Sequence, residues 1–186
     1  MIKIYEESEI KQGTDEWLEL RKNRISGTDG ASILRGKTFE EILEVKRNAK
    51  PFTGNYWTKR GHILEDESRN IYSEVYEPVK TAGIITNSKY PNAIFSPDGL
   101  IGEDGLWENK SFSKDKHLQT MEELTLEIIG QTQLGLFISE RKYCDLCLFN
   151  PDLPVEQAYF VKRIYPIPEI QQKFKDFFEK NLTFDQ

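Results

Sequence analysis

The chain has 186 residues, of which 38% are hydrophobic, and a net charge of −6 at pH 7. This length suits one domain, no apolar run approaches the ~20 residues that span a bilayer, and two cysteines are too few for a disulfide framework. The negative charge argues mildly against a nucleic-acid partner, although a local basic groove can coexist with an acidic total. Since no secretory signal is visible, we expect one cytoplasmic domain over residues 1–186.

The first half of the chain predicts helices. Three short helices are expected to begin at threonine N-caps, namely Thr14, Thr28 and Thr38. Glu41 completes a capping-box pattern with Thr38. A longer helical pattern runs from about Tyr56 to Tyr76. Its candidate inward positions are Ile63, Leu64, Ile71 and Val75.

Strand patterns follow, with one helix between them. The expected strands are Val79–Thr86, Ala93–Ser96, Leu106–Ser111, Tyr143–Phe149 and Ala158–Tyr165. A helix bearing Leu124 to Ile138 lies between the third and fourth strands, and Pro166 and Pro168 lead into a last helix with several phenylalanines. This order predicts an α+β fold, with a mixed central β-sheet flanked by helices.

Two carboxylates and a lysine form the most informative pattern. Asp98 precedes Glu108 by ten residues, and Lys110 follows two residues later. Side chains alternate along a strand, so Glu108 and Lys110 point to one face. A hairpin would bring Asp98 beside them. Carboxylates that hold one or two hard cations, with an ammonium group to position water or stabilise charge on phosphorus, suit phosphodiester hydrolysis.

This interpretation depends on the hairpin register. A two-residue turn on Asp104-Gly105 would pair Asp98 near Ser111 and place it on the wrong face. A longer loop centred near Glu103 would place it correctly. On spacing alone, a surface hairpin with solvated charges is the alternative, because 30% of the residues are charged.

Several segments in order resemble the lambda-exonuclease (YqaJ-like) family. The segments are Gln12-Gly13-Thr14-Asp15-Glu16-Trp17-Leu18-Glu19-Leu20-Arg21, Ile25-Ser26-Gly27-Thr28, Gly61-His62-Ile63-Leu64-Glu65, Ser96-Pro97-Asp98-Gly99-Leu100, Glu108-Asn109-Lys110 and Gln131-Thr132-Gln133. Each is weak alone, and the ordered set is specific over roughly residues 12–135. The resemblance implies a restriction-endonuclease-like PD-(D/E)xK nuclease domain, two Mg²⁺ or Mn²⁺ ions, and 5′→3′ digestion of linear double-stranded DNA that leaves 3′ single-stranded tails for phage-type recombination. It also implies a homotrimeric ring, a single-strand annealing partner and a phage or prophage protein in a bacterial host.

The resemblance implies roles for five residues at the reacting phosphate. Asp98 and Glu108 match metal ligands, and Lys110 matches the catalytic lysine. Glu65 matches a helix glutamate of the metal site, and Gln131 matches a glutamine that lines it. Two departures from the family pattern are Asn109, where an apolar residue is usual, and Ile128, where relatives can carry an aromatic.

Four further residues match phosphate contacts of the family. Arg21 and Thr28 match residues that grip the terminal 5′-phosphate, and Ser96 and Lys116 sit where further contacts are expected. Arginine suits this task because its planar fork can bind two phosphate oxygens. A hydroxyl at a helix N-terminus adds a donor where the dipole favours an anion.

Two other functions stay open at this stage. One is an endonuclease of the same fold, and the other is a non-catalytic DNA-end-binding module. Cys144 and Cys147 form a C-x-x-C pattern, but no second pair exists for a zinc site or an iron–sulfur cluster, so we expect ordinary strand residues.

Overall fold

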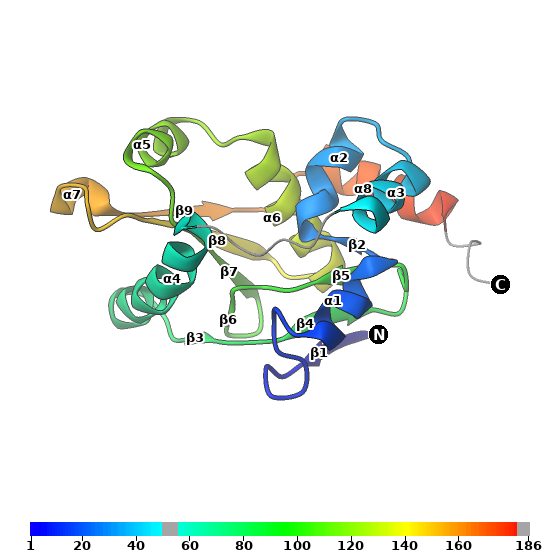
Figure 1. Cartoon of the computed structure of the whole chain (residues 1–186), viewed down its shortest axis with the longest axis horizontal. Coiled ribbons are helices and arrows are strands. Elements are labelled where there is room, and N and C mark those ends of the chain that lie inside the picture. Colours follow the sequence, from blue (N-terminus) through cyan, green and yellow to red (C-terminus); the bar gives the residue numbers. More distant parts are fainter. Residues whose placement is uncertain (50–55, 182–186) are drawn as a thin grey trace.

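The structure, a computed structural model, describes residues 1–49 and 56–181 and consists of two mixed β-sheets flanked by helices (Figure 1). The first sheet has the strand order β1 (Ile2–Tyr5), β4 (Ile84–Asn87), β5 (Ala93–Phe95) and β2 (Ile25–Ser26). The second has the order β3 (Val79–Lys80), β6 (Gly99–Ile101), β7 (Gly105–Lys110), β8 (Tyr143–Phe149) and β9 (Tyr159–Ile164). The predicted α+β class, with helices flanking mixed sheet structure, is confirmed, and two mixed sheets are present where one central sheet was expected.

The chain crosses between the two sheets three times, first between β2 and β3 and then at the two places described next. The segment Val79–Thr86, predicted as one strand, is instead split between β3 in the five-stranded sheet and β4 in the four-stranded sheet. After β5, the chain returns to the five-stranded sheet through the three residues Ser96, Pro97 and Asp98. We call these three residues the sheet junction. Asp98 therefore lies where the two sheets meet.

Most of the helices gather at two ends of the molecule. They are α1 (Asp15–Lys22), α2 (Gly30–Leu34), α3 (Phe39–Asn48), α4 (Tyr56–Val75), α5 (Lys114–Glu122), α6 (Leu126–Ser139), α7 (Val155–Ala158) and α8 (Pro168–Lys180), with the 3₁₀ turn η1 (Gly27–Asp29) before α2. Helices α2, α3 and α8 lie at one end, and α4, α5 and α7 lie at the other (Figure 1). None of the helices within the described ranges is long and apolar enough to span a membrane.

Two of the three predicted threonine caps are confirmed. Thr14 accepts a hydrogen bond from the backbone of Trp17 at the start of α1, and Thr38 forms the expected capping box with Glu41 at the start of α3. The prediction for Thr28 was wrong, because this residue lies inside η1. The turn is capped instead by Ser26, the residue before it, together with Asp29, its last residue.

The inward face of α4 differs from the prediction at two positions. Leu64, Ser68 and Tyr72 are buried, at the four-residue spacing of one helix face. Ile63 and Val75, predicted to point inward, are 73% and 66% exposed. The buried serine interrupts the apolar pattern, so that pattern indicated the wrong face at both ends of the helix.

Helix α6 lies at the centre of the fold and packs against α2, η1, α8 and strands of both sheets. It is buried along most of its length, and Leu134, Leu136 and Ile138 belong to the main core with Phe174 and Phe178 of α8. Helices α2 and α6 cross with their backbones in contact, because a Cβ added at Gly30 would lie 2.1 Å from the carbonyl oxygen of Gly130.

Candidate active site

Asp98 and Glu108 lie opposite each other at the base of the β6–β7 hairpin. The strands are antiparallel and pair Gly99 with Trp107, a register that places Asp98 across from Glu108. The loop that joins them is centred on Glu103, so the predicted longer loop is confirmed and the two-residue turn is wrong. The backbone N–H of Asn109 donates to Asp98 Oδ2 at 2.9 Å, which fixes the carboxylate at this end of the hairpin.

Glu108 is buried and surrounded by donors. Its side chain is 2% exposed, and its Oε1 accepts from Lys110 Nζ at 2.6 Å and from Gln131 Nε2 of α6. Burial acts to lower the pKa of Lys110, but the neighbouring Glu108 and Asp98 outweigh it and raise that pKa to about 12. Lys110 is thus a permanent ammonium group held next to two carboxylates.

Glu65 approaches the same group from α4. Its Oε1 accepts from Arg69 at 2.7 Å, and the same guanidinium nitrogen lies 3.5 Å from the backbone oxygen of Asp98. Burial and the nearby Asp98 raise the pKa of Glu65 to about 7. Arg69 therefore connects the helix glutamate to the sheet junction.

The three carboxylates together favour an added cation. Burial, Asp98 and Glu65 raise the pKa of Glu108 to about 8, because ionised carboxylates at short range repel one another. A hard divalent ion prefers oxygen ligands and would relieve this repulsion. The donor set thus fits Mg²⁺ or Mn²⁺, with Asp98, Glu108 and Glu65 as the residues that would hold it.

The carboxylates do not form a ready-made metal cluster. Within the described ranges, no three acidic, histidine or cysteine side chains are arranged so that they could already hold an ion. Each carboxylate bonds instead to a protein donor: Asp98 to the Asn109 backbone, Glu108 to Lys110, and Glu65 to Arg69. Metal binding would require these side chains to turn from their protein donors toward the ion.

A second group of residues, from α1 and η1, forms a positively charged site. Arg21 Nη2 lies 3.4 Å from the hydroxyl oxygen of Thr28, and its guanidinium lies 4.3 Å from the ring centroid of Trp17. The Trp17 indole N–H donates to Ser96 Oγ at 2.8 Å. The predicted phosphate residues Arg21, Thr28 and Ser96 are therefore brought together, with Trp17 between two of them.

Lys46 of α3 holds the turn that carries Thr28 in place. Lys46 Nζ lies 2.6 Å from Asp29 Oδ2, 2.6 Å from the carbonyl oxygen of Arg24 and 3.2 Å from Ser26 Oγ. Burial lowers the pKa of both Arg21 and Lys46. The two partly desolvated cations, Arg21 and Lys46, share one carboxylate, that of Asp29. The group therefore has a net positive charge that an anion can neutralise.

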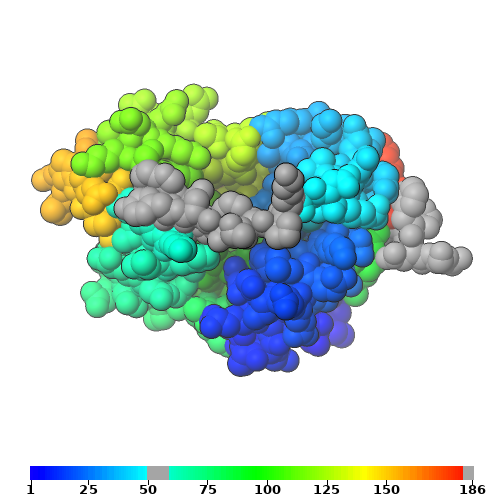
Figure 2. All heavy atoms as spheres, viewed as in Figure 1, coloured from blue at the N-terminus to red at the C-terminus, as the bar shows by residue number. Residues whose placement is uncertain are grey.

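Gln131 joins the two groups. A Cβ added at Gly27 in η1 would lie 3.5 Å from Gln131 Cγ, while the amide of the same glutamine donates to Glu108. Helix α4 and the α1–α3 segment lie on the same face of the molecule in the space-filling view (Figure 2). The carboxylate group and the Arg21 group are therefore parts of one site.

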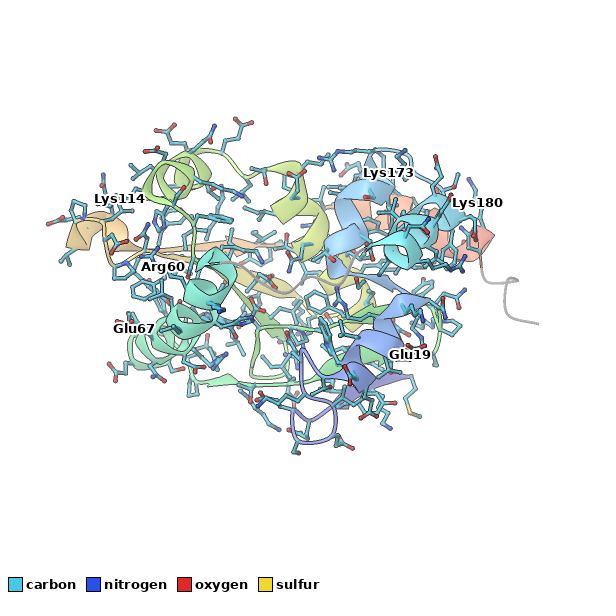
Figure 3. All side chains as sticks on the ribbon, in the orientation of Figure 1. Glu19, Arg60, Glu67, Lys114, Lys173 and Lys180 are labelled. Carbon is cyan, nitrogen blue, oxygen red and sulfur yellow. The ribbon has the colours of Figure 1, made fainter. Side chains whose placement is uncertain are left out.

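Lys116 does not join this site. It is exposed on α5, where its ammonium lies 4.1 Å from the ring centroid of Phe112. Lys114 at the start of the same helix and Glu19 on α1 project on opposite sides of the molecule (Figure 3). Among the contacts of the described residues, none joins Lys116 to Arg21, Thr28 or Ser96.

Three residues of the site were not singled out from the sequence. Arg69 follows Glu65 by four residues, a spacing that predicts an ion pair on a helix and could have indicated it. Asp29 follows Ser26 at capping-box spacing. Lys46 lies 17 residues beyond Asp29 in another helix, and no local signal connects them.

Residues 16–142 match the YqaJ-like viral recombinase domain, which covers more than half of the 186-residue chain. The chain belongs to this family. No curated protein matches the sequence. Family membership agrees with the resemblance carried by the ordered motifs and with the geometry of the site.

Solved structures agree with this assignment. An alkaline exonuclease from Laribacter hongkongensis, LHK-Exo, superposes with a TM-score of 0.75 at 26% sequence identity, over 90% of this chain and 92% of that chain. The same protein has been solved in complex with dAMP, with the same similarity. A phage-related exonuclease from Haemophilus somnus has a TM-score of 0.53 at 12% identity, over 90% of this chain and 94% of that chain, and shows the fold alone. Together with the family, the first of these supports a nuclease of the exonuclease type with the PD-(D/E)xK fold.

Proposed function

We propose that the chain is a Mg²⁺-dependent exonuclease that digests linear double-stranded DNA in the 5′→3′ direction from a 5′-phosphorylated end and leaves 3′ single-stranded tails. The observation that carries the proposal is the meeting of Asp98, Glu108, Lys110 and Glu65 beside a cationic group suited to a phosphate. Gln131 connects the two. An enzyme needs a binding site for a DNA end beside a site for phosphodiester hydrolysis only if it digests DNA from that end.

Each residue then has a distinct role. Arg21, Thr28 and Ser96 bind the terminal 5′-phosphate, with the guanidinium and the hydroxyl groups as donors. Lys110 positions the attacking water or donates to a phosphoryl oxygen as charge develops. Gln131 orients Glu108. Lys116, on α5, contacts the DNA backbone beyond the terminal phosphate.

Nucleases of this family generally use divalent metal ions. When bound, such an ion polarises the phosphoryl oxygens and lowers the pKa of water. Asp98, Glu108 and Glu65 would hold it here. Mg²⁺ is the ion we propose, with Mn²⁺ as its substitute and two ions as the full complement.

The experiment is a time course on linear duplexes that carry either a 5′-phosphate or a 5′-hydroxyl, with each terminus labelled separately. We expect loss of the 5′ label first, and faster digestion of the phosphorylated duplex. Asp98→Ala should reduce cleavage by at least about 100-fold, the scale of removing one preorganised electrostatic contact, while DNA binding persists. Arg21→Ala should reduce the preference for phosphate about tenfold or more, since a hydrogen bond to a charged group contributes about 1.5–3 kcal/mol.

Two controls separate the alternatives. Covalently closed plasmid should persist, because an exonuclease has no end to bind, and its cleavage would favour an endonuclease. Lys22→Ala removes an exposed cation from α1, next to Arg21, and should leave the preference unchanged. Full activity of Asp98→Ala would contradict the proposed site. Metal-independent binding without hydrolysis in the wild-type protein would favour a DNA-end-binding module.

The proposal includes an assembly taken from the family resemblance. We propose a homotrimeric ring around the duplex, which explains processive digestion, and a single-strand annealing protein that receives the exposed 3′ strand. Light scattering of the purified protein measures the first, and a monomeric mass in the presence of DNA would contradict it.

A further inference from the structure

The strongest unassigned feature of the site is Trp17. Its indole N–H donates to Ser96 Oγ at 2.8 Å, and the Arg21 guanidinium lies 4.3 Å from its ring centroid. These two partners are 75 residues apart in the chain. Trp17 is only partly buried, and the rest of its ring packs against the small cluster of Ile10, Ile84 and Ile94. One side chain thus contacts two residues that we assign to the terminal phosphate.

Both contacts prepare donors for an anion. A guanidinium held over an aromatic face is oriented without using its N–H groups, which point outward from the edge of the plane. The Ser96 hydroxyl has one proton and two lone pairs. Because it accepts from Trp17, its own proton is left to donate elsewhere. Trp17 therefore orients Arg21 and Ser96 so that both can donate hydrogen bonds to an anion.

The same segment also holds the sheet junction. Gln12, just before α1, donates through Nε2 to the carbonyl oxygen of Pro97 at 3.1 Å. Pro97 lies between Ser96 and Asp98 in the junction. The contacts from Gln12 and Trp17 thus fix the three residues that carry both a phosphate contact and a carboxylate of the candidate metal site.

We propose that Trp17 is a positioning residue that couples recognition of the 5′-phosphate to the placement of Asp98. The inference rests on the proposed function and adds to it. The indole N–H holds Ser96 in a fixed position relative to α1. A phosphate bound by Arg21 and Ser96 therefore has a fixed position relative to the sheet junction. Without it, Ser96 and the junction can move independently of α1, so the end is bound less selectively and the cut is slower.

The test uses Trp17→Phe, Ser96→Ala and the double variant. Phenylalanine keeps an aromatic face for Arg21 and much of the apolar packing, and it removes the N–H together with part of the indole ring. We measure kcat and KM on 5′-phosphorylated and 5′-hydroxyl duplexes, and binding of both duplexes in a chelator. Trp17→Phe should lower the rate ratio of phosphate to hydroxyl ends about three- to tenfold, the scale of one net hydrogen bond. The double variant should show no larger loss than Ser96→Ala alone, because the N–H acts through Ser96.

Several outcomes would overturn the inference. An unchanged ratio in Trp17→Phe, or losses that multiply in the double variant, would show that the indole N–H does not act through Ser96. Equal losses on both substrates, with a lower urea midpoint, would show a packing role only. Leu18→Ala is the matched control, because this side chain lies on the exposed face of the same helix and is 53% exposed. If the wild-type enzyme shows no preference for 5′-phosphorylated ends, the proposed binding of the 5′-phosphate is wrong as well. If the wild-type enzyme keeps that preference and Trp17→Phe does not change it, only the role of Trp17 is wrong.

Discussion

At the scale of single residues, Glu108 is a buried carboxylate that ionises with difficulty until a cation joins it. Its pKa of about 8 arises from burial and from Asp98 and Glu65. A carboxyl whose pKa is raised on folding contributes stability that is fully present below its unfolded pKa of about 4.5 and is lost as the pH rises through its folded pKa. The metal-free protein should therefore lose stability between about pH 5 and pH 8.

Glu108→Gln should flatten this pH dependence, because the amide is neutral throughout. We expect the slope of the free energy of unfolding against pH to differ between wild type and variant by up to about 1.4 kcal/mol per pH unit, the value for one proton. Urea titrations in a chelator at several pH values measure it. Glu19→Gln, at an exposed position on α1, should keep the wild-type slope. Identical slopes for Glu108→Gln and wild type would contradict the raised pKa.

The residues that share a local signal could be predicted, and those joined only by the fold could not. Asp98, Glu108 and Lys110 were visible because a hairpin and strand alternation relate them within a few residues. Arg21, Thr28 and Ser96 needed the family resemblance, because no periodicity connects α1 to the sheet junction. The Lys46–Asp29 ion pair and the Trp17–Ser96 hydrogen bond join separate elements, and no local pattern in the sequence specified them.

At the scale of elements, the contact between α2 and α6 positions the site. The backbones touch at Gly30 and Gly130, and Gln131 is the next residue along α6. Since α2 follows η1 directly, this contact also sets the distance between Thr28 and Gln131. The two glycines are therefore as important for the site as its polar residues.

Gly130→Ala should destabilise the protein and disturb the site. A Cβ there would lie 2.2 Å from the backbone nitrogen of Ala31, so the helices must separate. Overpacking of this kind costs about 1–3 kcal/mol. Urea unfolding measures the loss, and cleavage assays should show a slower enzyme. Gly61→Ala is the control, because a Cβ at Gly61 in α4 has nothing within 4 Å and helix propensity then favours alanine by about 1 kcal/mol. Equal stability of the two variants would contradict this account.

The sequence predicted most elements and failed where tertiary contacts decide. The caps at Thr14 and Thr38 and the strand Tyr143–Phe149 were predicted because capping and alternation are local. The break between β3 and β4 was missed, because both halves have strand character and only the two-sheet arrangement separates them. The inward face of α4 was misassigned for a similar reason, since Ser68 is buried against tertiary neighbours.

At the scale of the whole molecule, apolar packing holds the fold together. The main core lies around α6 and α8 and consists of apolar side chains. Removing a bound metal should therefore inactivate the protein without unfolding it. Adding metal should stabilise the native state by mass action, since only the folded chain assembles the carboxylates.

Thermal unfolding with and without Mg²⁺ tests this expectation. At a metal concentration of about 100 times Kd, the stabilisation is about 2.7 kcal/mol. For a chain of this size, that corresponds to a rise in Tm of roughly 5–10 °C. Asp98→Ala should abolish the rise, whereas Glu103→Ala, in the exposed hairpin loop, should keep it. An unfolded protein after chelation, or the same rise in Asp98→Ala, would contradict the assignment.

The junction between the two sheets gives the proposed enzyme a fixed step length. Ser96, at its first position, is assigned to the anchored DNA end, and Asp98, at its last, to the bond that breaks. Two peptide units span at most about 7 Å, so the interval between anchor and cut is limited by covalent chain rather than by loops that can vary. The size of the fragment released in each round would then be a property of this spacer, the same at every end the protein binds and independent of base sequence.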